Sequence, residues 1–464
     1  MNMASLALDQ GNSHFESRTP LASLSTAEDA SRRLHFWLTC GILAVFFFFI
    51  AHNLTVSRLP DYAHYDDSVI SVAVGTNFIR RIAFFAFGGL GLFLAFVSSR
   101  QPWRFSPALA LPMIGYLLWC CASVLWSIDP STCLKRVVTL ICFNLCAFGI
   151  GRRFTMRELA WMMFVIMGGY FALGLVMELS LGTFRPWSSG HRFAGTLHPN
   201  SQASHLTMFC LAAFCLGLAE PRHRGKLYLL VAVGLGFVLL TRSRTNAAAA
   251  VVALGFIWML RSSLKAKLNV AFVSVGLISL GLLLLVLQGV DPLTELLQAA
   301  MLGRKDDVQT LSGRNLIWPI CWSYIQQKPW LGYGYGSFWN TARIDEFLEE
   351  LQFSLFEAHN GYLELRLGTG MIGLLLYVTG MVTGLIASAR ACLISRESSF
   401  ALLFGVMIFA FIFSNSESGM MGINLVTLLM TSLMFHLAFC PAPTASGSDQ
   451  PTEIAVLEPL RASK

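Results

Sequence analysis

Long apolar runs separated by short polar segments repeat along nearly the whole chain. A membrane-spanning helix needs roughly 20 mainly apolar residues, and about twelve runs of that kind occur. They begin near Phe36, Ile82, Pro107, Leu134, Leu159, Ser201, Leu227, Thr245, Asn269, Gly361, Phe400 and Gly422. The pattern therefore predicts an all-α polytopic membrane protein with about twelve transmembrane helices.

The composition agrees with this class. Hydrophobic residues make up 55% of the chain and charged residues only 13%, about half the charged share of a soluble domain. Such a chain has too little polar surface for a soluble fold. The 11 cysteines lie mostly in apolar runs, without metal-type CxxC pairs or a disulfide framework. We interpret them as small apolar packing residues.

Basic residues gather in alternate short loops close to the predicted helix ends. This set comprises Arg32, Arg33, Arg100, Arg104, Arg152, Arg153, Arg157, Arg222, Arg224, Lys226, Arg261, Lys265, Lys267, Arg390 and Arg396. Short loops rich in Lys and Arg stay on the cytoplasmic side of a membrane. The pattern therefore places these loops and both chain termini in the cytoplasm.

The polar segments divide the chain into three parts. We expect residues 1–34 to be a disordered cytoplasmic tail, residues 35–440 the membrane domain and residues 441–464 a second disordered tail. Within the membrane domain, residues 288–358 form a large outer loop between spans nine and ten, too long for a simple connector. Its stretch WPICWSYIQQKPW predicts an amphipathic helix at the membrane interface.

A second set of basic residues lies on the predicted outer side. Its members are Arg80, Arg81, Lys135, Arg136, Arg192, Arg242, Arg244 and Arg314. Charge at membrane depth is costly, although each residue alone has a plain explanation in snorkelling to lipid phosphates. Guanidinium groups bind phosphate bidentately, so several converging on one cavity would form a diphosphate site. A polyprenyl-diphosphate-linked sugar is the obvious ligand on that face.

Five strings occur in a characteristic order and spacing: VLWSIDPSTCLKR, HRFAGTLHPNSQAS, LTRSRT, SGRNLIWPICWSYIQQKPWLGYGYGSF and EAHNGYLELRLGTGMIG. Each is short, but the ordered set resembles the O-antigen ligase superfamily of bacterial envelope glycosyltransferases. The resemblance covers roughly residues 126–373. That superfamily includes ligases that join O-antigen to lipid A-core and polymerases of exopolysaccharide repeat units.

The resemblance implies a lipid-dependent glycosyltransferase fold in the bacterial inner membrane, with the active site facing the periplasm. The enzyme would move a glycan from an undecaprenyl diphosphate carrier to an acceptor hydroxyl, with no cofactor and no metal. Expected partners are the undecaprenyl-diphosphate-linked oligosaccharide, membrane lipids and a chain-length regulator, but no nucleic acid.

The resemblance also implies roles for particular residues. His359 in AHNGYLE matches the family histidine, which we expect to act as a general base with a near-neutral pKa. Arg314 in SGRN matches the loop arginine and is the second expected catalytic residue. Arg192, Arg242 and Arg244 are expected to bind the diphosphate, with no basis for choosing between the last two.

Four further residues are weaker candidates. Lys135 and Arg136 match a basic pair of the family, with snorkelling as an equal alternative. Asn360 either orients the imidazole or caps a helix. Glu364 either pairs internally with Arg366 or lines the cavity.

Three functions remain open at this point. Polymerisation of exopolysaccharide repeat units is favoured by the resemblance of WSIDPS and HRFAGTLHPNSQA, and O-antigen ligation to lipid A-core is its sibling. A transporter or flippase of lipid-linked oligosaccharide would also suit many spans and a cationic cavity. Transporters usually show internal repeats, whereas the two halves of this chain show no convincing similarity.

Overall fold

The computed structural model describes residues 21–52, 78–97, 102–188, 190–287, 314–351, 355–395, 397–419 and 422–440. Only the backbone is described for residues 21–29, 78–81, 276–287, 315 and 350–351. All regular elements in these ranges are helices. The prediction of an all-α protein is therefore confirmed.

A helix lies at every predicted apolar run. In chain order these are α1 (Leu21–Ala51), α3 (Phe78–Phe96), α4 (Pro107–Ala122), α5 (Pro130–Arg153), α6 (Met156–Ser180), α7 (Pro199–Ala219), α8 (Arg224–Leu240), α9 (Arg244–Arg261), α10 (Leu264–Leu287), α14 (Gly361–Ile394), α15 (Phe400–Phe413) and α16 (Leu425–Phe439). The remaining elements are α12 (Arg314–Gln327), α13 (Thr341–Leu351) and two short 3-10 turns, η3 (Ser123–Trp126) and η4 (Pro221–His223).

Not all of these helices meet the length and hydropathy expected of a membrane span. Among the described residues, 7 helical segments do: Ala30–Ala51, Pro107–Trp126, Pro130–Arg153, Met156–Ser180, Pro199–Ala219, Pro221–Leu240 and Gly361–Ile394. Three shorter apolar segments are Ile82–Phe96, Phe400–Phe413 and Leu425–Phe439. Helices α9 and α10 are in neither group. The number of about twelve spans thus stays a prediction.

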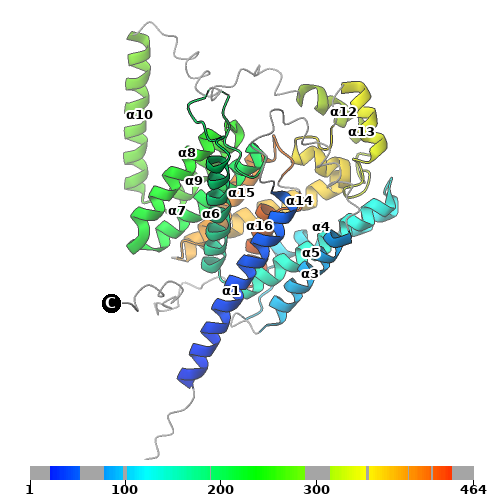
Figure 1. Ribbon diagram of the computed structural model, residues 1–464, viewed down its shortest axis with the longest axis horizontal. Coiled ribbons are helices and arrows are strands. Elements are labelled where there is room, and N and C mark those ends of the chain that lie inside the picture. Colours follow the sequence, from blue (N-terminus) through cyan, green and yellow to red (C-terminus); the bar gives the residue numbers. More distant parts are fainter. Residues whose placement is uncertain are drawn as a thin grey trace, which may run out of the picture.

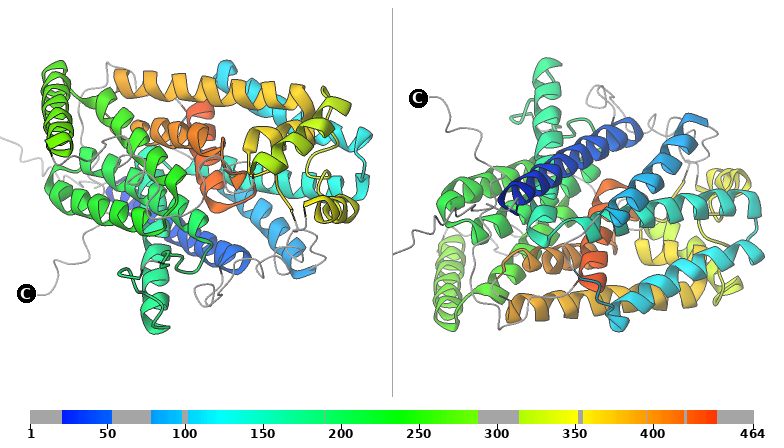
Figure 2. Two further views of the ribbon diagram at one scale, coloured as in Figure 1. Left: turned by 90° about the horizontal axis from the view of Figure 1, so that it is seen from above. Right: turned by 90° about the horizontal axis from the view of Figure 1, so that it is seen from below.

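Helices α7, α15 and α16 form the centre of the bundle. Nearly all their side chains are buried, which is why they are apolar on all sides rather than on one stripe. Helix α1 crosses the outside of the bundle, while α10 stands at its edge and α12 and α13 gather at one corner (Figures 1 and 2). The central helices hold the connections that build the site described below.

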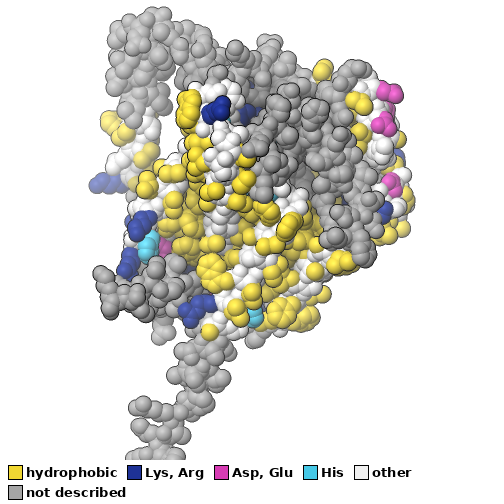
Figure 3. Space-filling view, in the orientation of Figure 1, with side chains coloured by type: hydrophobic (Ala, Val, Ile, Leu, Met, Phe, Trp, Pro, Cys, Tyr) yellow, Lys and Arg dark blue, Asp and Glu magenta, His cyan; other side chains and the backbone are white. Residues whose placement is uncertain are grey.

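The surface of the bundle is itself strongly apolar. Large side chains such as Phe49, Phe85, Phe96 and Phe272 are at least half exposed. In Figure 3, hydrophobic side chains cover the middle of the described surface, and several Lys and Arg side chains lie toward its left edge. An apolar surface of this extent suits lipid rather than water, as expected of an integral membrane protein.

Several of the basic loops predicted to share one side are joined by contacts. Arg32 Nη2 lies 2.5 Å from the Glu158 carboxylate, which links α1 to the start of α6. Arg157 pairs with Glu220 at the end of α7. Arg261 at the end of α9 donates to the Cys392 carbonyl near the end of α14 (3.1 Å). These loops therefore lie at one end of the bundle, which we call the basic end.

Of two expectations about the polar segments, the structure departs from one and agrees with the other. Helix α1 begins at Leu21, so residues 21–34 are helical where a disordered tail was expected. Helix α12 contains most of the WPICWSYIQQKPW stretch, which confirms a helix there, while its place at a membrane interface stays a prediction. Residues 1–20, 288–313 and 441–464, and the side chains of Arg80 and Arg81, lie outside the described part.

The α12–α13 region is held to the bundle by a break in α14. Gly370 has a φ of +68° inside the helix, and Trp330 packs directly against it. Tyr333 N donates to the Leu367 carbonyl (2.8 Å) and Gly334 N to the Gly368 carbonyl (2.9 Å). Backbone therefore meets backbone at this junction, which only glycine permits.

Replacement of Gly370 by alanine should detach this region from α14. The added methyl group would overlap the Trp330 carbonyl, and the backbone at φ +68° and ψ −166°, a region that is nearly exclusive to glycine, costs about 1–3 kcal/mol more. We expect a lower melting temperature in detergent and loss of activity. Gly169→Ala in α6 is the control, because its methyl group would enter open space. Equal melting of the two variants would contradict this account.

Candidate functional site

The polar connection between α15 and α16 is the point at which distant parts of the chain meet. We call residues 414–418 the SNSES turn. The starts of four helices bind it: Asn200 of α7, Thr245 of α9, Arg314 of α12 and Gly361 of α14. Because a helix N-terminus carries partial positive charge and unpaired N–H groups, this convergence favours an anion.

Glu417 of this turn is bound by residues from two of those helices. Its Oε1 accepts hydrogen bonds from Arg314 Nη2 (2.8 Å) and from Asn200 Nδ2 (2.8 Å). The Nε of Arg314 is buried and has no hydrogen-bond partner among the described residues. One edge of this guanidinium is therefore available for a further acceptor such as a phosphate oxygen.

Arg192 is connected to the same cluster through Asn200. Its Nη2 donates to Asn200 Oδ1 (3.2 Å) and its Nε donates to the Thr241 carbonyl (3.0 Å). The second bond ties Arg192 to the TRSRT turn, residues 241–245. Arg192 and Arg314 thus lie on either side of the Asn200–Glu417 pair.

The TRSRT turn holds Arg242 and Arg244 at different places. Arg242 has a left-handed backbone (φ +53°) and directs Nη2 to the Ser188 carbonyl (3.4 Å). Arg244 is the first residue of α9, and its neighbour Thr245 accepts a hydrogen bond from Ser416 of the SNSES turn (2.9 Å). Of the two, Arg244 is thus attached closer to the cluster.

His359 faces two carboxylates. Its Nδ1 lies 3.0 Å from Glu357 Oε1 and 3.7 Å from Glu417 Oε2, and its side chain is 38% exposed. Its backbone is also left-handed, with φ +48°. His359 and Arg242 are the two non-glycine residues with positive φ in the described part. Such strain persists only where the surroundings enforce it and gathers at functional sites.

The surroundings of His359 change the chemistry expected of it. Burial lowers the pKa of this imidazole, but the close carboxylates of Glu357 and Glu417 with their negative charges outweigh burial and raise the pKa to about 10. The near-neutral pKa expected from the sequence is therefore not what this structure gives. The two carboxylates therefore favour the protonated form of this imidazole.

Glu364 and Asn360 position the segment that carries His359. The Glu364 carboxylate accepts from Trp339 Nε1 (3.0 Å) and from the Ala358 backbone N–H. Asn360 Oδ1 caps α14 by accepting from Tyr362 N (3.0 Å), and its Nδ2 donates to the Asn415 carbonyl (3.1 Å). The capping alternative for Asn360 agrees with these contacts, and Glu364 binds Trp339 and the backbone.

Loss of the Glu364 carboxylate should loosen this segment. Glu364→Leu leaves the Trp339 and Ala358 N–H groups unpaired, at about 1–3 kcal/mol for each buried donor, whereas Glu364→Gln retains one acceptor oxygen. We expect the leucine variant to melt well below the glutamine variant in detergent. A leucine variant as stable as the wild type would show that these bonds do not hold the segment.

The remaining two candidates lie apart from the SNSES turn. Lys135 is exposed on the first turns of α5. Arg136, on the same helix, packs against the turn at Gly336, and Glu364 and Tyr335 are among its charged and polar neighbours. Arg136 therefore lies close enough to Glu364 for their charges to interact, and the roles of Arg136 and Lys135 stay predictions.

Glu357, His359 and Glu417 also have a donor set that a metal ion can use. One ligand atom from each lies within 4.8 Å of the others. A metal would require a deprotonated imidazole, whereas the two carboxylates favour the protonated form. Arg314 already neutralises Glu417, which further weakens the attraction for a cation. Metal independence stays a prediction that a chelator can test.

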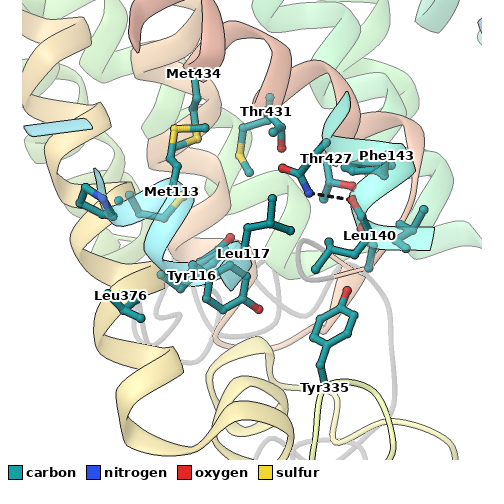
Figure 4. Close-up of a pocket in the computed structure, with 18 residues that line it drawn as sticks. Met113, Tyr116, Leu117, Leu140, Phe143, Tyr335, Leu376, Thr427, Thr431 and Met434 are labelled. Carbon is teal, nitrogen blue, oxygen red and sulfur yellow. Dashed lines mark hydrogen bonds between the residues drawn. The ribbon is translucent and has the colours of Figure 1, made fainter. Parts of the chain in front are cut away.

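A separate cavity lies deeper in the bundle. It has a volume of about 110 Å³ and lies among α4, α5, α14 and α16. Figure 4 shows Tyr116 of α4 and Tyr335 of the α12–α13 connection beside it, with Met113 and Met434 farther in. None of the candidate residues lines it. The polar site and this mainly apolar cavity are therefore distinct features.

Sequence reasoning missed Glu417, Asn200 and Glu357. Asn200 lies within the HRFAGTLHPNSQAS string and Glu357 within EAHNGYLE. Both strings were singled out, but neither residue was assigned a role. Glu417 has a signal of its own, because five polar residues interrupt two strongly apolar runs at 414–418. A polar interruption at membrane depth is costly, and this one proves to be the centre of the site.

Comparisons with known proteins give a consistent classification. Residues 227–378 match the family model described as O-antigen ligase. The chain is also 27% identical over 350 residues to the exopolysaccharide production protein ExoQ of Rhizobium meliloti (strain 1021), a match that covers 70% of this chain and 76% of ExoQ. The TRSRT turn, Arg314 and His359 lie inside the matched family region, while Glu417 lies beyond it. Together the two matches show that about a third of this membrane protein is similar to the O-antigen ligase family model and that most of the chain is similar to an exopolysaccharide production protein.

Proposed function

We propose that this protein is a membrane glycosyltransferase that moves a glycan from an undecaprenyl diphosphate carrier to an acceptor hydroxyl at the periplasmic face. The observation that carries the proposal is the convergence of His359 and four helix starts, Arg314 among them, on the SNSES turn, with Arg192 attached to it through Asn200. The relationship to the O-antigen ligase family and to an exopolysaccharide production protein supports glycan transfer as the activity.

The arrangement suits a donor that already has a good leaving group. The acceptor oxygen attacks the anomeric carbon, the bond from that carbon to the phosphate oxygen breaks, and the carrier diphosphate leaves with the electron pair. Arg314, Arg192 and Arg244 stabilise the charge that develops on the diphosphate, as fixed cations in a partly buried site. No redox cofactor enters this balance.

The proton of the acceptor hydroxyl needs a base. Since the two flanking carboxylates favour the protonated form of His359, we assign it to the diphosphate as a cationic donor and assign the proton to one of these carboxylates. Glu357 is the better candidate of the two, because its side chain is 42% exposed while that of Glu417 is 13% exposed and already bound by Arg314. This replaces the general-base role expected for His359.

Polymerisation of repeat units is the reaction that we favour over ligation to lipid A-core, because the similarity to the exopolysaccharide protein spans most of both chains. Deletion of the gene separates the two. Accumulation of single repeat units on the carrier supports the polymerase. Full-length polymer on the carrier with uncapped lipid A-core would instead identify a ligase.

The activity itself is testable with purified protein in liposomes. Labelled lipid-linked oligosaccharide is supplied on the accessible side, and the expected product is a new glycosidic bond, formed equally with and without EDTA. Movement of the label between leaflets without bond formation would identify a transporter. Loss of activity in EDTA, restored by a divalent cation, would show that Glu357, His359 and Glu417 hold a metal.

A further inference from the structure

One acidic side chain lies at the centre of the cationic site. Glu417 accepts from Arg314 and Asn200 through Oε1, while its Oε2 lies 3.7 Å from His359 Nδ1. Its partners come from α12, from α7 and from the segment before α14, which are far apart in the chain. No other described carboxylate contacts both of the residues that we propose for catalysis.

The SNSES turn does not depend on this carboxylate for its own fold. The Ser414 carbonyl accepts from Gly361 N (2.8 Å), and Ser416 donates to Thr245 (2.9 Å). Asn360 binds the Asn415 carbonyl and the Ser418 hydroxyl. The backbone position is therefore fixed by the neighbours of Glu417, and its carboxylate is left to act on the cations.

We propose that Glu417 is a positioning residue, whose carboxylate holds the Arg314 guanidinium and the His359 imidazole in place before the donor binds. The inference rests on the proposed function and deepens it. A site whose cations are already oriented spends no binding energy on ordering them. Two long cationic side chains would otherwise repel each other and move apart.

The charge of Glu417 also acts on the proton of His359. The imidazole is faced by Glu357 on its own segment, by Glu417 from the α15–α16 connection and by Glu364 from α14, with Arg314 on the far side of Glu417. Glu417→Gln removes one negative charge and keeps the shape of the side chain. The variant should therefore lower the pKa of His359.

Kinetics of variants give the first test. We expect Glu417→Gln to lower kcat by about 10- to 100-fold, the usual effect of losing a charged hydrogen bond at a reacting site, and Glu417→Asp to retain intermediate activity. Glu346→Gln is the control, because Glu346 makes a 2.7 Å ion pair with Arg343 within α13 and lies outside the proposed site. Glu417→Gln combined with Arg314→Ala should cost less than the product of the two single effects, because the part that acts through Arg314 is already lost.

A second measurement does not need the activity. Diethyl pyrocarbonate labels neutral imidazoles, and mass spectrometry measures the rate at which His359 is labelled. If the pKa of His359 falls by about one, labelling near pH 7.5 becomes about tenfold faster in Glu417→Gln, while Glu346→Gln labels like the wild type. Unchanged labelling overturns the positioning role, whatever the kinetics show.

The two measurements separate the inference from the function on which it rests. Faster labelling in Glu417→Gln together with a wild type that transfers no glycan would refute the proposed function and leave the effect of Glu417 on His359 established. An active wild type whose Glu417→Gln variant keeps its full kcat would overturn the positioning role and leave the function standing.

Discussion

Replacement of Arg314 by alanine should lower the rate of glycan transfer by about 100-fold or more, the usual effect of removing one preorganised donor from a charge-stabilising site. The variant also leaves Glu417 without its cationic partner. The rate is measured with purified protein in liposomes containing labelled lipid-linked donor. Immunoblots of the membrane fraction check that the variant is inserted.

Arginine and lysine should differ at this position. Arg314 binds Glu417 through Nη2 while its Nε is unpaired, so the guanidinium can bind two acceptors at once. An ammonium cannot reproduce that planar fork, and Arg314→Lys should rescue poorly. Arg343→Ala, which removes an arginine paired with Glu346 on α13, is the control. Normal transfer in Arg314→Ala would remove Arg314 from the mechanism.

Replacement of His359 by alanine should abolish product formation, and the pH dependence of the wild type should reveal the form in which His359 acts. Its pKa of about 10 lies above the ordinary value of 6.5. The protonated form is therefore complete at neutral pH and is lost as the pH rises through about 10. If the imidazolium is required, the rate stays level near neutrality and falls on the alkaline side.

A transfer rate that increases with pH would instead identify His359 as a general base. If His359 must accept the hydroxyl proton, the rate increases with pH throughout the range below 10, because only the small neutral fraction is active. In Glu417→Gln the alkaline fall should begin at lower pH, because one stabilising negative charge is gone. A profile that rises steadily toward pH 10 would return His359 to the base role and exclude Glu357 as the proton acceptor.

Much of the architecture follows from local sequence. Hydropathy is a property of consecutive residues, so every apolar run in the sequence proves to hold a helix. The assignment of basic residues to alternate loops also used local sequence alone. It separated the residues of the basic end from the arginines of the motif strings. Arg192 and Arg314 were found in this way, whereas His359 and the roles of all three came from the resemblance of their short strings to the family.

The sequence by itself thus determined a helical membrane protein, the segments that carry its chemistry and the cationic character of one site. Only the tertiary structure decided how those segments meet, because Glu417, Asn200 and Arg314 lie in three different strings and their distances depend on helix packing. The preference of His359 for its protonated form also depends on the tertiary structure, since carboxylates from two parts of the chain lie beside it. The break of α14 at Gly370 is a third case. Local sequence does not show why a glycine with positive φ lies in this apolar run, because the reason is the close approach of the Trp330 backbone.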